Sequence, residues 1–188
     1  ETPLPISALL YDSQQRLWVG SLGGGLALFE PRSGEFTSFG YDDEQPTSLS
    51  GDAVTFIFED SQGRIWVGSG NHFLTDSKSR GLNLFREKSG DFRRFYRPPG
   101  VDGKSPSNAV KAMTEDPHGR LWLGYADGAL IRFEPESGKM TPEPLPAGKV
   151  RQSDGFTSLY ADRQGGLWLG TRSDGLYSWL PDRDHFTQ

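Results

Sequence analysis

The sequence predicts an all-β fold of repeated four-stranded antiparallel units, because one motif recurs four times and three strand-like segments recur with it. The motif reads Asp-x-x-x-x-Leu/Ile-Trp-Val/Leu-Gly, and its register contains no gap. The copies occupy Asp12–Gly20, Asp60–Gly68, Asp116–Gly124 and Asp162–Gly170. Four matches in register are not produced by chance, so the repeat predicts a single architecture for the whole chain.

The first strand of each unit precedes the motif and is apolar on both faces. Six positions before the Asp stand Ile6, Val54, Val110 and Phe156, and three positions before it stand Leu9, Ile57, Met113 and Leu159. These two positions differ by an odd number, so they point to opposite faces of a strand. Burial of both faces is typical of sheets that are stacked on other sheets.

The motif itself predicts a tight turn followed by the second strand. Asp with Ser or Pro opens the turn, and a β-rich run around the Trp follows it. Gly63, Gly119 and Gly165 supply permissive dihedral angles in three copies. Gln15 stands at this place in the first copy, which predicts either a slightly strained turn or a turn of another type. The Asp side chains are expected to accept hydrogen bonds from nearby backbone amides.

Two further strands complete each unit. The third is read at Gly25–Phe29, Gly81–Phe85, Ala129–Phe133 and Gly175–Trp179. After a turn, a fourth strand carries an apolar residue seven positions beyond the aromatic one, at Phe36, Phe92, Met140 and Phe186.

The spacing of the repeat identifies the architecture. Successive motif tryptophans are 48, 56 and 46 residues apart, and the middle value includes an insertion of 8 residues within Asn71–Arg80. A period of about 40–50 residues with four antiparallel strands is typical of a β-propeller blade. Residues 1–188 are therefore interpreted as a propeller region with blades at about 2–39, 50–96, 107–143 and 153–188. The four blades form either a complete ring, part of a larger ring, or half of an eight-bladed ring of two copies.

The full pattern resembles the two-component regulator propeller repeat. It runs Val-x-x-Ile-x-Glu-Asp-x-x-Gly-x-Ile-Trp-Val-Gly-Ser, then Gly-Leu-x-x-Phe, then Ser-Gly-x-Phe-x-x-Phe, and it covers Ile6 to Phe186. The resemblance implies the extracytoplasmic sensor region of hybrid two-component sensor kinases or diguanylate cyclases, on the periplasmic side of a bacterial inner membrane. It implies that ligand binding or dimerisation is passed to an output module outside this sequence. Rings of this family are commonly seven-bladed, from which four blades differ.

Composition and motifs narrow the function classes. A net charge of −5 and a pI of about 5.2 argue against a nucleic-acid partner. No apolar run approaches the roughly 18 residues of a membrane span, so membrane contact is expected only through segments outside this sequence. His72, His118 and His185 have no metal-ligand spacing, and no Gly-x-Ser-x-Gly element occurs. We expect no metal, no cofactor and no catalytic residue in this chain.

The expected ligand face is the one whose loops vary. In a four-stranded meander, the turns after the first and third strands lie on one face and those after the second and fourth on the other. The first set is uniform and the second is not, and function on repeat scaffolds concentrates in variable loops. The candidate ligand-binding residues are Tyr41, Asp42, Asp43, Glu44, Asn71, His72, Asp76, Arg80, Arg97, Arg151, Asp154, Arg172 and Asp174. Their mixed charge suits a polar small molecule or an oligosaccharide.

Other interpretations remain open beside ligand sensing. A propeller that docks proteins without any signalling role is the first alternative, and an enzyme at the propeller mouth is a weaker one. Trp18, Trp66, Trp122 and Trp168 are expected to be core anchors rather than sugar-stacking residues. Self-association is expected as well, because an open arc of four blades would expose apolar flanks around Ile6/Leu17 and Phe156/Leu167.

Overall fold

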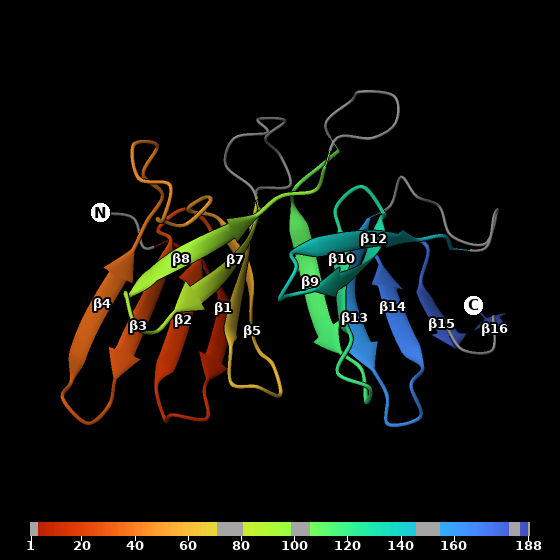
Figure 1. Ribbon diagram of the computed structural model, residues 1–188, viewed down its shortest axis with the longest axis horizontal. Helices are drawn as coiled ribbons and strands as arrows, with labels where there is room; N and C mark the ends of the chain where they lie inside the picture. The colour runs from red at the N-terminus through yellow and green to blue at the C-terminus, as the bar shows by residue number, and fades with distance from the viewer. Residues whose placement is uncertain (1–3, 71–80, 99–105, 146–154, 181–184, 188) are drawn as a thin grey trace. The chain divides into compact units, whose positions relative to one another are not determined.

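The computed structural model confirms the all-β class and the four-stranded blades. It describes residues 4–70, 81–98, 106–145 and 155–180, and the backbone of 185–187. In these residues every regular element is a β-strand. The strands form four antiparallel sheets, and within each sheet they follow one another in chain order (Figure 1). None of the described residues forms a helix that is long and apolar enough to cross a membrane.

The first two sheets are blades 1 and 2. Blade 1 contains β1 (Ile6–Tyr11), β2 (Leu17–Ser21), β3 (Leu26–Glu30) and β4 (Glu35–Phe39). Blade 2 contains β5 (Val54–Glu59), β6 (Ile65–Ser69), β7 (Gly81–Arg86) and β8 (Asp91–Phe95). Together they form the first of two compact units, Glu1–Pro98.

The other two sheets are blades 3 and 4. Blade 3 contains β9 (Val110–Glu115), β10 (Leu121–Tyr125), β11 (Leu130–Glu134) and β12 (Lys139–Glu143). Blade 4 contains β13 (Phe156–Ala161), β14 (Leu167–Thr171), β15 (Leu176–Leu180) and β16 (His185–Thr187). They form the second unit, Pro99–Gln188.

The motif Asp organises its turn through both carboxylate oxygens. Oδ1 of Asp12 accepts the amides of Gln14 and Arg16 at 3.0 and 2.9 Å, and Oδ2 accepts Arg16 Nε at 2.8 Å and Trp18 Nε1 at 2.7 Å. Asp60 and Asp116 repeat this pattern. The backbone bonds match the sequence expectation, whereas the indole and guanidinium bonds were not foreseen.

The turn at Gln15 keeps the type of the other three. Its φ is 65°, beside 73°, 75° and 83° for the glycines at the equivalent position. A non-glycine residue in this left-handed region is strained by roughly 1–2 kcal/mol. Of the two alternatives that the sequence left open, the strained turn is therefore the observed one.

Each unit has a core at the junction of its two blades. In the first unit the motif Trp18 packs edge-on against Phe85 of blade 2, with ring centroids 4.9 Å apart. In the second, Trp122 packs in the same way against Trp179 of blade 4, at 5.8 Å. Phe85 and Trp179 occupy the same place in the repeat, so the two junctions are built alike.

The Gly that ends each motif makes room for the next blade in both junctions. A Cβ atom on Gly20 would lie 2.4 Å from Val54 Cγ1, and one on Gly124 would lie 3.0 Å from Phe156 Cβ. Val54 and Phe156 are equivalent residues at the start of β5 and β13. These glycines therefore permit close side-chain contact between neighbouring blades.

Two sequence expectations about exposure need correction. Phe156 and Leu167 are buried in the core of the second unit, because they face blade 3 rather than an open flank. Trp168 is exposed, unlike Trp18, Trp66 and Trp122, because no blade among the described residues packs on its face. The predicted open flank of blade 4 therefore exists, but on the opposite side of the sheet.

Candidate functional site

The described part of the predicted variable face is dominated by the segment 40–52, which joins blade 1 to blade 2. The tight turns β1–β2, β3–β4 and β5–β6 lie at one end of the first unit, and this segment lies at the other (Figure 1). The β2–β3 connection shares that end, because Gly23 and Gly25 both donate backbone hydrogen bonds to the carbonyl of Asp52. The topological prediction of two unlike ends is therefore correct for this unit.

Arg94 on β8 holds this segment from the side. Its Nε donates to the carbonyl of Ser48 at 2.8 Å, and one terminal nitrogen donates to the carbonyls of Gln45 and Leu49 at 2.8 and 2.9 Å. The guanidinium also lies 5.5 Å from the centre of the Tyr41 ring. The backbone amide of Phe92 adds a bond to the carbonyl of Thr47 at 2.8 Å. The segment is thus fixed to blade 2 by side-chain and backbone bonds.

Local hydrogen bonds give the first half of the segment a defined shape. The amide of Tyr41 donates to Asp52 Oδ1 at 2.7 Å, and the amide of Asp42 donates to Ser48 Oγ at 2.8 Å. The amide of Glu44 donates to Asp42 Oδ1 at 2.9 Å, which is a turn in which an Asp side chain replaces a backbone acceptor. The side chains of Asp42, Asp43 and Glu44 remain exposed on this frame.

Tyr41 carries the aromatic surface of the site. Its hydroxyl donates to Asp43 Oδ1 at 2.8 Å. That hydrogen bond raises the pKa of the Tyr41 phenol above its ordinary value, because the carboxylate favours the protonated form. Tyr41 is therefore a neutral hydroxyl at physiological pH, with a ring held between Arg94 and the exposed acidic residues.

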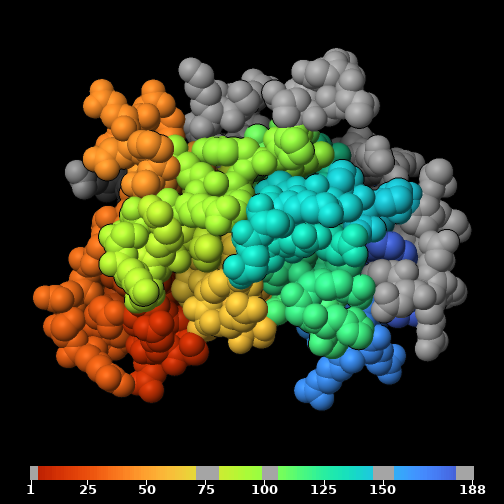
Figure 2. Space-filling model, viewed as in Figure 1, coloured from red at the N-terminus to blue at the C-terminus, as the bar shows by residue number. Residues whose placement is uncertain are grey.

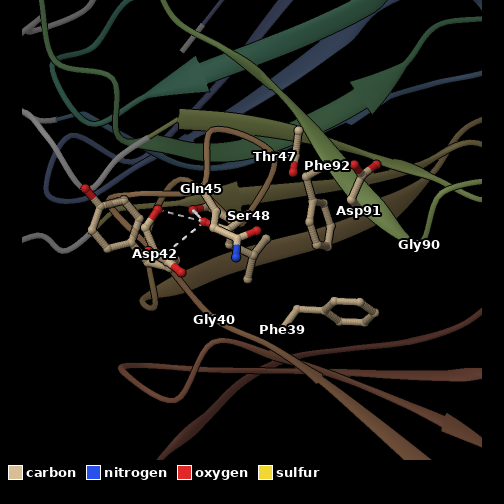
Figure 3. A pocket seen from close by; sticks show the side chains of 11 residues that line it. Phe39, Gly40, Asp42, Gln45, Thr47, Ser48, Gly90, Asp91 and Phe92 are labelled. Carbon is tan, nitrogen blue, oxygen red and sulfur yellow. Dashed lines mark hydrogen bonds between the residues drawn. The ribbon is translucent and has the colours of Figure 1, made fainter.

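A cavity of about 380 Å³ lies between the segment and the start of β8. Figure 3 shows Asp42 and Ser48 on the segment, and Asp91 and Phe92 on the strand across from them. Hydrogen bonds from Ser89 and Arg86 lower the pKa of the Asp91 carboxyl, so it stays ionised. The cavity is open and partly polar, with carboxylate, hydroxyl and amide groups beside the rings of Phe39 and Phe92.

A second cavity, of about 360 Å³, adjoins the first across Thr47. Its lining includes Arg86, Arg93 and Arg94 as well as the exposed Tyr96. The segment therefore has an acidic rim on one side and a basic rim on the other. In the space-filling view it is the orange projection at the upper left, next to the yellow-green atoms of β7 and β8 (Figure 2).

The predicted site residues are only partly brought together. Tyr41, Asp42, Asp43 and Glu44 share the segment, and the half-buried Arg97 follows β8 in the same unit. Arg172 and Asp174 belong to the second unit, where Asp174 accepts a bond from the Tyr177 hydroxyl. The remaining candidates, Asn71, His72, Asp76, Arg80, Arg151 and Asp154, lie outside the described residues.

Arg94 was missed by the sequence argument, although the sequence contains a signal for it. Arg94 lies two residues after the buried Phe92 on β8. Because side chains two residues apart on a strand point to the same face, Arg94 points to the face that Phe92 buries. A cation at such a place is rarely tolerated unless it has partners.

In the described part of the chain, no group of three or more His, Cys, Asp or Glu residues could hold a metal ion.

Known structures share this fold. The extracellular domain of a proposed hybrid two component system from B. thetaiotaomicron aligns with a TM-score of 0.75 and 21% identity, over 100% of this chain and 24% of that one. The extracellular domain of a proposed one component system from the same organism aligns with a TM-score of 0.75 and 25% identity, over 100% and 22%. The chain thus spans about a quarter of the length of these neighbours.

Sequence comparison gives a distant relative and a family. The photosystem II assembly lipoprotein Ycf48 of Synechococcus is 28% identical over 89 residues, which are 44% of this chain and 27% of that protein. The two component regulator propeller family matches three segments, residues 48–71, 104–127 and 151–173. Each segment leads into or includes a motif Trp strand of blades 2, 3 and 4, and the sequence resemblance is confirmed. Three of the four repeats therefore match the two component regulator propeller model, and the fold is that of the extracellular domains above.

Proposed function

We propose that this chain is part of the extracytoplasmic sensor propeller of a bacterial membrane signalling receptor. The family, and neighbours that are extracellular domains of two component and one component systems, support this role. The output module, a histidine kinase or a diguanylate cyclase, lies outside this chain. The propeller receives the signal on the periplasmic side of the inner membrane and has no catalytic role of its own.

The ligand of this sensor is a polar small molecule or an oligosaccharide, and segment 40–52 is its binding site in the first unit. The observation that carries this proposal is the set of hydrogen bonds from Arg94 to three backbone carbonyls of the segment. A loop ordered before binding loses little conformational entropy on binding, so even an open polar site can reach useful affinity. The sheet of blade 1 does not require these hydrogen bonds, because its four strands pair with one another without the segment.

The chemistry of the segment suits hydroxyl-rich ligands. The exposed carboxylates of Asp42, Asp43 and Glu44 accept hydrogen bonds from hydroxyl groups, and the Tyr41 ring offers an apolar surface for the C–H face of a sugar. The basic rim beside Thr47 adds donors for an acidic substituent. A neutral or acidic oligosaccharide would use both sides of the segment.

The test is binding of the purified chain to an array of neutral and acidic oligosaccharides, followed by calorimetry on the glycans that bind. Tyr41→Ala and Asp42→Ala should each weaken binding at least tenfold, whereas Tyr41→Phe keeps the ring and should lose less. Arg32→Ala is the matched control, because Arg32 is exposed in the uniform β3–β4 turn. Equal affinity of Tyr41→Ala and the parent chain would contradict the site, and binding of proteins but no glycan would favour the interaction scaffold.

A further inference from the structure

A buried amide side chain, Asn83 on β7, departs from the pattern of the repeat. Asn83 is 0% exposed, and no other repeat has an amide at the equivalent position of its third strand. The equivalent residues are Ala27, Ile131 and Tyr177. A buried amide is costly unless its donors and its acceptor have partners. Because the other blades form without one, the partners of Asn83 indicate what it does in blade 2.

Asn83 links β6 to the end of segment 40–52. Its Oδ1 accepts the backbone amide of Ser50 at 2.9 Å, and its Nδ2 donates to the carbonyl of Val67 at 2.9 Å. The bond to Val67 on β6 fixes the orientation of the amide group, because a carbonyl can accept only from the NH2 side. Asn83 therefore presents a fixed acceptor to the segment.

A pair of buried hydroxyl groups holds Ser50 from a second direction. Ser50 Oγ and Ser69 Oγ are 2.6 Å apart, and both residues are 0% exposed. Ser69 Oγ also lies 3.4 Å from the carbonyl oxygen of Gly81, to which it donates. A Cβ atom on Gly81 would lie 2.9 Å from Ser50 Oγ, so the glycine makes room for the hydroxyl. Ser50 therefore anchors the end of the segment inside blade 2.

Asn83 and Arg94 hold the segment as a cross-strand pair. They lie directly opposite each other in the register of β7 and β8. Arg94 donates to the carbonyls of Ser48 and Leu49, and Asn83 accepts the amide of Ser50. One donor side chain and one acceptor side chain therefore fix three consecutive residues. The equivalent pairs in the other repeats are Ala27 with Ser38, Ile131 with Pro142 and Tyr177 with Gln188.

Residues 48 and 49 in turn hold two of the proposed binding residues. The amide of Asp42 donates to Ser48 Oγ at 2.8 Å (Figure 3), and Tyr41 forms an isolated parallel β-bridge with Leu49. Asn83 is fully buried, so it does not contact a ligand itself. Its effect on binding would therefore pass through residues 48–50 to Tyr41 and Asp42.

We propose that Asn83 is a positioning residue of the ligand site: together with Arg94 it fixes residues 48–50 and thereby places Tyr41 and Asp42. The inference rests on the proposed function of segment 40–52. Residues that are already in place lose less conformational entropy when a ligand binds. Loss of Asn83 should therefore weaken binding without removing any group that touches the ligand.

The first measurement needs no ligand. Amide hydrogen exchange, followed by NMR, compares the parent chain with Asn83→Ala at Tyr41, Asp42 and Ser48, whose own amide hydrogen bonds do not involve Asn83. We expect exchange at these three amides to be roughly tenfold faster, because a buried donor that loses its acceptor favours local opening of the segment. The sheet amides of β6 should change less than the three segment amides.

Ile65→Ala is the matched control, because Ile65 is an apolar residue of β6 that is only 2% exposed. Its truncation removes packing from blade 2 but none of the hydrogen bonds that hold the segment, so sheet amides should be affected at least as much as segment amides. Asn83→Leu is a second variant, in case Asn83→Ala does not fold. It fills the site with an apolar side chain, as Ile131 does in blade 3, and lacks both hydrogen bonds, so the segment amides should again exchange faster.

Unchanged exchange at Tyr41, Asp42 and Ser48 in the Asn83 variants would overturn the positioning role. The second measurement is calorimetry on the tightest-binding glycan of the array, for which Asn83→Ala should bind about tenfold more weakly and Ile65→Ala nearly as well as the parent. Faster exchange with unchanged affinity would show that Asn83 orders the segment but that the segment is not the ligand site. An array in which no glycan binds would contradict the proposed ligand class alone, because the exchange result still decides what Asn83 does.

Discussion

The turns at Asp12 and Asp162 have nearly the same hydrogen bonds, yet they hold their tryptophans in different surroundings. Oδ2 of each Asp accepts the indole N–H of its Trp, at 2.7 Å in blade 1 and 3.0 Å in blade 4. Trp18 is buried against blade 2, whereas Trp168 is exposed. The motif therefore fixes the position of the indole by local chemistry, and its burial depends on whether another blade follows.

A second difference concerns the residue two positions before the Trp. Arg16 pairs with Asp12 and lies over the Trp18 ring, with its guanidinium carbon 5.3 Å from the ring centre. Gly166 stands at this position in blade 4, so Trp168 has no cation above it from this position. Blade 1 therefore adds an ion pair and a cation–π contact to the same turn, next to a blade junction.

The largest expected effect is removal of the two tryptophans. Trp18→Ala should lower the free energy of unfolding by about 3–5 kcal/mol, because it leaves a cavity in the junction of the first unit. Trp168→Ala should cost less, since 39% of this residue is already exposed to water. Urea unfolding followed by circular dichroism measures both values.

The half-buried Phe85, which packs against Trp18, provides a second check on the junction of the first unit. Phe85→Ala should also be costly, because it removes the ring on which Trp18 packs. Equal costs of Trp18→Ala and Trp168→Ala would contradict the role of the following blade.

The second-largest expected effect is the loss of unfolding free energy when the carboxylate of a motif Asp is replaced by an amide. Burial opposes ionisation of Asp12, but hydrogen bonds from Trp18 and from Arg16 outweigh it and lower its pKa. In Asp12→Asn the amide group must place its N–H donors against Arg16 Nε or Trp18 Nε1, which are also donors. One mismatch of this kind costs about 1–3 kcal/mol. Asp162→Asn should be milder, because Gly166 stands in place of the Arg partner and Trp168 is partly hydrated.

The stabilisation that the Asp12 carboxylate contributes should decrease as the pH falls. A carboxyl whose pKa is lower in the folded than in the unfolded state stabilises the fold above the unfolded pKa, about 3.9 for Asp. This contribution is lost as the pH falls through the folded pKa. The difference in unfolding free energy between the parent and Asp12→Asn should therefore be full at pH 7 and shrink below about pH 4. A difference that is constant down to pH 2 would contradict the shift.

The repeat allowed much of the fold to be predicted, and the reason is physical. Strand order, the blade as a unit and the Asp–amide turn follow from local spacing, which the sequence repeats four times. Local spacing could not predict the hydrogen bonds from Arg94 to segment 40–52, nor the exposure of Trp168. Arg94 lies 46 residues from its partner Ser48, and the environment of Trp168 depends on what lies beyond its sheet.

The smallest expected effect separates turn strain from blade contacts. Gln15 adopts φ 65° in a turn where the other copies have Gly, so Gln15→Gly should relieve roughly 1–2 kcal/mol of strain. Glycine also gains freedom in the unfolded chain, which removes about 0.5–1 kcal/mol of this benefit. The net gain should be about 0.5–1 kcal/mol in urea unfolding, and Gln15→Ala is the matched control, because alanine is strained at this φ as well. Equal stabilisation by both substitutions would show that loss of the Gln15 side chain, including its bond from Arg32, decides the effect rather than the backbone.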